Sequence, residues 1–215
     1  MVPGCPDTLV ESNIRAAVIE LCEKAAVYQQ ELDPVTTVAN IYEYDLEPPN
    51  GTVVHKIVWG LFEGKDLEPI SSGLLEQRKP KWREATNAGV PEYFLKQGQA
   101  LFWLVPVPNE TKVSSVILHA QLKPTYTSTA CETEVMSDHR DSIINGTLFR
   151  LLRLPSKEWS DFQGAAVYSN LFFEGVSNAE RRARQGDTGV ARRVKYGGIY
   201  KKSDTRKYGS GKRVF

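Results

Sequence analysis

Residues 192–215 combine the side chains that bind phosphate with those that stack on nucleic-acid bases. The stretch is RRVKYGGIYKKSDTRKYGSGKRVF, with nine Lys or Arg residues and one acidic residue, Asp204. Lysine and arginine pair with phosphates and aromatic rings stack on bases, so the pattern is typical of a tail that binds nucleic acid. Arg and Tyr are also frequent anchors of protein interfaces, so the stretch equally fits an arm that docks on a protein. A third interpretation is a terminus that serves only solubility.

The distribution of charge favours the docking arm. Residues 181–215 hold 12 of the 27 basic residues and 2 of the 26 acidic ones, so this segment carries +10 and the rest of the chain −9. A nucleic-acid-binding body would continue the basic footprint, whereas this body is acidic. Four aromatic residues among the last twenty-four are more than solubility requires. We therefore expect an arm with too little apolar surface to fold alone, which orders on a partner.

No set of residues in the chain predicts catalysis. His55, His119 and His139 are dispersed along the sequence, and the motifs HExxH, CxxC and GxSxG do not occur. The GSGKR run lacks the spacing of a phosphate-binding loop. We expect no catalytic residue, no metal site and no cofactor.

The cysteines and the hydropathy pattern indicate the compartment in which the protein is expected. Cys5, Cys22 and Cys131 lack metal-site spacing, and an odd number argues against a disulfide framework. No apolar run approaches the roughly 18 residues that a bilayer-spanning helix needs. The opening MVPGCPDTLVE lacks the basic and then apolar order of a secretory signal. We expect a reducing compartment and no membrane partner.

Apolar residues at helical spacing predict three long helices. The first covers 8–32 and ends at Asp33-Pro34, because a residue before proline disfavours the helical conformation. The second covers 133–154, and the third covers 161–185 and stops at Gly186.

Two local features refine these helices. Thr8 with Glu11, and Thr129 with Glu132, match the capping-box pattern at the first two helix starts. Gly146 lies within the second helix, where glycine costs roughly 1 kcal/mol relative to alanine. The simplest reason for glycine there is close contact with another helix.

The segment between the first and second helices predicts strands. TTVANIYEYDLE and TVVHKIVWGLFE alternate apolar and polar residues, and Pro48-Pro49-Asn50-Gly51 between them predicts a hairpin turn. EGKDLEP predicts a second turn. The pattern indicates a small antiparallel β domain, either a sandwich or a partly closed barrel.

We therefore predict an α+β fold. An α-helical bundle, made of the N-terminal helix and two C-terminal helices, carries an inserted small antiparallel β domain and an extended basic C-terminal arm. The expected divisions are 1–34 for the N-terminal helix, 35–128 for the β domain, 129–186 for the helix pair and 187–215 for the arm.

Three regions of the chain resemble the head-to-tail adaptor (head completion, or neck) proteins of tailed bacteriophages. The opening helix of that family is similar to GCPDTLVESNIRAAVIELCEKA, which is followed by ELDP. The family's β region is similar to WGLFEGKDLEPIS, KWREATNAGVPEYFL and LFWLVPVPNE, with a G-x-x-L-x-P turn and a strand ending in P-x-P. Its closing helix pair is similar to INGTLFRLLRLPSKEWSDFQGAAVYSNLFFEGVSNAERRA. The order and spacing of these motifs extend the resemblance over residues 3–185.

The resemblance implies a structural protein of the virion neck, present in the host cytoplasm during assembly. Such adaptors form a ring, generally a dodecamer, beneath the portal after genome packaging. They extend the DNA channel, help retain the genome and provide the platform for the tail. The implied partners are the portal protein, a tail tube or nozzle protein and further copies of the chain. Genomic DNA would pass through the channel without sequence-specific binding.

In this family the C-terminal arm reaches along the portal, which implies that the basic tail is a portal-docking arm. The arm residues expected to make contact are Arg192, Arg193, Lys195, Tyr196, Tyr200, Lys201, Lys202, Arg206, Lys207, Tyr208, Lys212, Arg213 and Phe215. The ring would form through the helices 8–32, 133–154 and 161–185. The alternative is a nucleic-acid-binding protein that uses the same tail.

Overall fold

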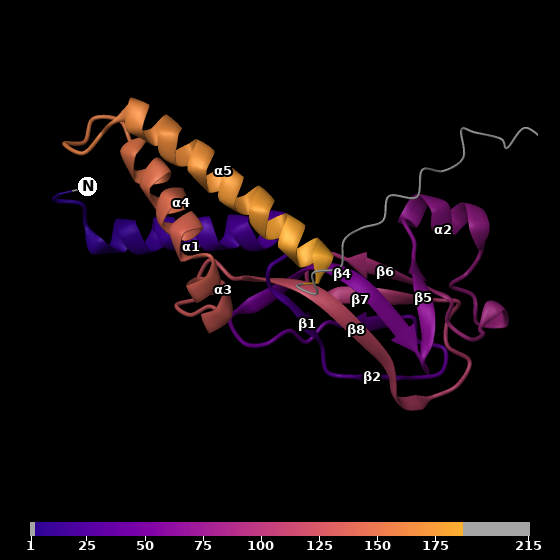
Figure 1. Cartoon of the computed structure of the whole chain (residues 1–215). Helices are drawn as coiled ribbons and strands as arrows, with labels where there is room; N and C mark the ends of the chain where they lie inside the picture. The colour runs from indigo at the N-terminus through magenta and orange to yellow at the C-terminus, as the bar shows by residue number, and fades with distance from the viewer. Residues whose placement is uncertain (1–2, 187–215) are drawn as a thin grey trace, which may run out of the picture.

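A limb of three helices projects from a curled eight-stranded sheet in the computed structural model, which describes residues 3–186 (Figure 1). The limb consists of α1 (Asp7–Ala25), α4 (Arg140–Leu152) and α5 (Phe162–Gln185). Two shorter helices, α2 (Ser72–Arg78) and α3 (Thr133–Asp138), and a 3₁₀ turn at Ala85–Asn87 complete the helical elements. The basic arm 192–215 lies outside the described residues.

Two long strands, β4 (Thr52–Phe62) and β8 (Lys112–Pro124), form the spine of the sheet. The strands follow one another in the order β1-β8-β4-β5-β6-β7-β3, with β2 also paired to β8. All pairs are antiparallel except β5 with β6. The remaining strands are β1 (Gln29–Glu31), β2 (Val35–Thr37), β3 (Glu43–Asp45), β5 (Lys65–Pro69), β6 (Tyr93–Gln97) and β7 (Leu101–Val105).

One of the two predicted turns is confirmed. Glu63 and Gly64 join β4 to β5 with φ of 49° and 76°, which is the pair of positive φ values that a tight two-residue hairpin needs. The rest of the EGKDLEP segment is strand β5. The predicted hairpin at residues 48–51 is wrong, because β3 pairs with β7 at the edge of the sheet and β4 pairs with β8 and β5. Burial of Tyr44 against Phe102, with ring centroids 5.7 Å apart, fixes β3 on β7.

The first helix ends earlier than the sequence pattern predicts. Ala26 adopts a left-handed conformation with φ of 52°, and the chain then turns back so that β1 pairs with β8. Tyr28 and Leu32 are buried in the core beside this strand, which outweighs continuation of the helix to residue 32. The tertiary burial of two apolar side chains has overridden the local helical period.

The predicted capping boxes do not form. The N-cap residue of α1 is Pro6 and that of α3 is Glu132. Neither side chain accepts a hydrogen bond from the backbone of its helix. The second predicted helix is also divided in two, because His139 leaves the helical conformation with φ of −114° between α3 and α4.

The last helix is bounded by local signals. The Asp161 carboxylate accepts hydrogen bonds from the backbone N–H groups of Gln163 (3.1 Å) and Gly164 (2.9 Å). At the other end Gly186, with φ of 62°, caps the helix, which confirms the predicted stop.

The prediction of a helical bundle with a small β insert is wrong. The fold is mixed α/β, with an eight-stranded curled sheet and five helices in residues 3–186. One hydrophobic cluster contains Leu21 of α1, Phe172 of α5 and Leu118 of β8, so the helices and the sheet share a core. The strands therefore form a principal layer of the protein. The division of the chain at residues 34, 128 and 186 stays a prediction.

Candidate interaction surfaces

The three limb helices meet at Gly146 of α4. A Cβ atom added there would lie 2.7 Å from Cδ2 of Phe172 on α5 and 3.0 Å from Cβ of Ala17 on α1. Real Cβ contacts are rarely this short, so the crossing has no room for a larger residue. A second small residue, Gly175 of α5, abuts Ser142 of α4. This geometry supports the expected helix–helix contact at Gly146.

A charged pair ties α1 to α4 beside this crossing. The Arg150 guanidinium pairs with the Glu20 carboxylate and donates to the Gly146 carbonyl oxygen. It also lies over the rings of Phe149, 4.5 Å from the centroid, and Phe172, 5.3 Å. Burial lowers the pKa of Arg150, and the neighbouring Glu20 opposes that shift. The pair and the crossing together hold the limb in one arrangement.

An apolar groove of about 390 Å³ runs between α1 and α4. Its floor is buried at Ile143 and Leu151, whereas Ile144 on its wall is 43% exposed. Nothing in residues 3–186 covers it. The lining residues are Val10, Ile14, Met136, Arg140, Ile143, Ile144, Thr147, Leu148 and Leu151.

A second apolar patch lies on the outward side of α5. Val167 and Leu171, one helical turn apart, are 58% and 43% exposed. The residues that α5 buries, including Phe172 and Val176, point to the other side of the helix. The limb therefore presents two unlike apolar surfaces.

A polar groove of about 610 Å³ lies where the limb joins the sheet. It is bounded by the end of α1, the start of β1, α3 and the last turns of α5. Three carboxylates line it, those of Glu132, Glu134 and Asp138, together with one arginine, Arg182.

Only one of the expected contact residues lies within the part of the chain that the structure describes. Gly146 lies at the helix crossing, whereas all the arm residues from Arg192 to Phe215 lie outside the described part of the chain. Sequence reasoning missed both grooves. A signal for the apolar one existed, because Ile143, Ile144 and Leu148 cover a wider arc of α4 than one neighbouring helix can bury.

Neither a metal site nor a membrane-spanning helix is found in the described residues. In residues 3–186 no group of three or more His, Cys, Asp and Glu side chains is arranged to hold a metal ion. His119 stacks on Trp59, with centroids 5.1 Å apart and planes 3° apart. Within the same residues no helix combines the length and apolar character that crossing a bilayer demands.

A packed helical limb with uncovered apolar surfaces is characteristic of proteins that assemble with other proteins. Residues 5–194 match the family model described as SU10 adaptor protein. The chain belongs to this family of phage head-to-tail adaptors. No curated protein matches it.

Membership confirms the family predicted from the order of sequence motifs. The protein is a phage adaptor, hence a structural component of the virion that interacts with other head or tail proteins.

Proposed function

We propose that the chain forms a dodecameric ring in the phage neck. The ring docks under the portal, extends the DNA channel, helps retain the genome and carries the tail tube or nozzle protein. Its subunits are present in the host cytoplasm during assembly. The protein acts without catalysis.

The observation that carries this proposal is the pair of unlike apolar surfaces on one limb. A cyclic ring of more than two subunits uses head-to-tail contacts, in which one surface of a subunit meets a different surface of the next. The groove between α1 and α4 and the patch of Val167 and Leu171 on α5 supply two such surfaces. The close helix crossing at Gly146 and the Arg150–Glu20 pair keep them at a fixed relative orientation.

The charge distribution supports the channel role. The chain before residue 181 carries −9, and a wall of that sign repels the phosphate backbone. DNA can then slide past without being retained by tight phosphate contacts. The basic segment 192–215 supplies the complementary contact, which we assign to the portal.

Replacing Ile144 with glutamate tests the role of the apolar groove. Ile144 is 43% exposed, so Ile144→Glu should leave the melting temperature within about 2 °C of the unchanged chain. A charge buried in the subunit contact should instead prevent ring formation on portal particles. Sedimentation velocity of chain–portal mixtures gives the number of subunits bound.

The matched control is Val113→Glu, at an 81% exposed valine of β8 outside the groove. The control should assemble like the unchanged chain. Complete rings formed by Ile144→Glu would show that the groove is not a subunit contact.

A further inference from the structure

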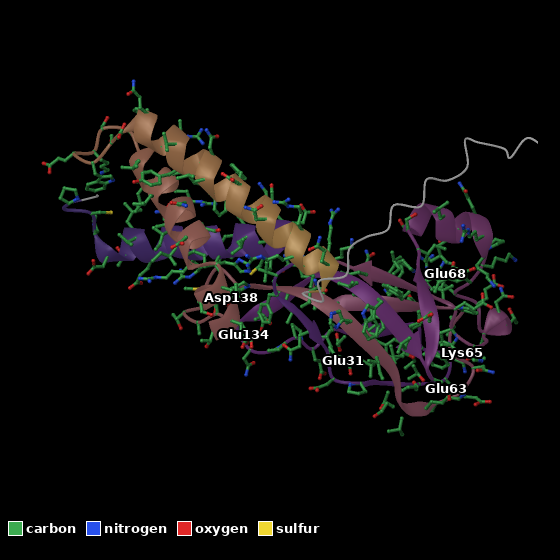
Figure 2. The ribbon with its side chains drawn as sticks, in the orientation of Figure 1. Glu31, Glu63, Lys65, Glu68, Glu134 and Asp138 are labelled. Atoms are coloured by element: carbon green, nitrogen blue, oxygen red, sulfur yellow. The ribbon has the colours of Figure 1, made fainter. Side chains whose placement is uncertain are left out.

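The polar groove at the junction of limb and sheet carries unbalanced negative charge. Glu134 and Asp138 project from α3 at this junction (Figure 2). Within residues 3–186 no lysine or arginine forms a salt bridge with Glu132, Glu134 or Asp138, and the Ser137 hydroxyl donates a hydrogen bond to Asp138 at 3.2 Å. Arg182 alone among the lining residues carries a permanent positive charge. The groove is therefore suited to a cationic occupant.

Apolar and aromatic side chains also line the groove, beside the polar side chains of Gln29, Gln30 and His139. Val27 and Tyr28 contribute from the chain after α1, Val135 from α3, and Ala179 and Ala183 from α5. Lysine and arginine place their aliphatic stems on apolar surface while their charged ends meet carboxylates. The groove thus matches an extended basic peptide better than a small cation.

The chain itself contains such a peptide a few residues after the groove in the sequence. Gly186, the cap of α5, is one of the lining residues, and Arg192 follows six residues later. An extended chain spans at most about 20 Å over six residues. The family match continues to residue 194, so the first two arginines of the arm belong to the matched segment.

We propose that, in the free protein, this groove binds the segment 192–196 (RRVKY) of the same chain. Tethering by a few residues gives an effective concentration in the millimolar range, which favours the chain's own segment over that of another copy. The contact covers the first basic residues of the arm, and these are released when the arm meets its assembly partner. The proposal does not depend on the identity of that partner.

Limited trypsin digestion of the full chain tests the contact, with cleavage sites followed by mass spectrometry. The triple variant Glu132→Gln, Glu134→Gln, Asp138→Asn should be cleaved about threefold or more faster after Arg192, Arg193 and Lys195, because the ion pairs with the groove are lost. Cleavage after Lys207 and Lys212 should be unchanged and serves as the internal reference. Raising NaCl to about 0.5 M should have the same selective effect on the unchanged chain, since salt screens exposed ion pairs.

The control variant removes three carboxylates from the far end of the sheet: Glu63→Gln, Asp66→Asn and Glu68→Gln. Glu63 and Glu68 lie well apart from Glu134 and Asp138 (Figure 2). This control should digest like the unchanged chain. Equal cleavage of the triple variant and the unchanged chain at all sites would overturn the proposal, as would protection of 192–195 that disappears on tenfold dilution, which would identify a second copy as the occupant.

Discussion

Gly146→Leu should lower the stability of the chain by about 3 kcal/mol, at the upper end of what overpacking usually costs. Even a Cβ atom at this position would lie 2.7 Å from the Phe172 ring and 3.0 Å from Ala17. A leucine adds three further carbons at a point where α1, α4 and α5 all meet, so the helices must separate. We expect the melting temperature to fall by about 6–12 °C in a calorimetric scan.

Gly73→Leu is the matched control for this substitution. Gly73 also lies in a helix, α2, but a Cβ added there meets nothing within 4 Å. This variant should be as stable as the unchanged chain or slightly more stable, because leucine has the higher helix propensity. An unchanged melting temperature for Gly146→Leu would mean that the crossing yields without cost and does not hold the limb.

Deletion of residues 192–215 should abolish stable docking on the portal while leaving the body folded. The buried hydrophobic residues of the described part lie between Ala17 and Ala179, so the deletion removes none of them. The melting temperature should therefore change by less than about 2 °C. The deletion removes nine basic and four aromatic residues, which are the anchors that the docking hypothesis assigns to the portal contact.

Replacing the nine Lys and Arg residues of this segment with Gln provides the companion variant, since it keeps the length and the aromatic residues. A loss of docking in both variants would identify the charges as the cause. Docking of the deleted chain at the affinity of the unchanged chain would show that the arm is not the portal contact. That outcome would leave the trypsin test of the polar groove unaffected, because the two contacts are measured separately.

Elements with local signals could be predicted from the sequence. The end of α5 could be predicted at Gly186, because glycine readily adopts the left-handed conformation that terminates a helix. Glu63-Gly64 formed the turn between β4 and β5 for the same conformational reason. The family could be recognised because its motifs occur in a fixed order along the chain.

The pairing of strands, and the large share of the fold that the sheet makes up, could not be predicted from local signals. β3 lies on β7 because Tyr44 packs against Phe102, a contact between residues far apart in the sequence. The end of α1 at Ala25 likewise depends on β1 pairing with β8. Such non-local contacts override helical or alternating patterns without leaving a local trace.

Of the candidate surfaces, the sequence likewise indicated the one with a local signal and missed those built from distant residues. Gly146 was visible as a costly residue in a helix, so a close contact could be expected at that position. The apolar groove requires the relative placement of Ile14 on α1 and Ile144 on α4, which only the folded chain defines. The polar groove at the junction of limb and sheet similarly unites residues of α3 with the end of α5.

Sedimentation of the full chain, mixed separately with portal rings and with a short DNA duplex, tests the adaptor function most directly. Both mixtures are measured at low and at moderate salt, because phosphate-mediated binding weakens steeply as salt rises. We predict co-sedimentation with the portal at moderate salt and little binding to the duplex. Salt-sensitive binding to the duplex with none to the portal would contradict the adaptor function and identify residues 192–215 as a nucleic-acid-binding tail.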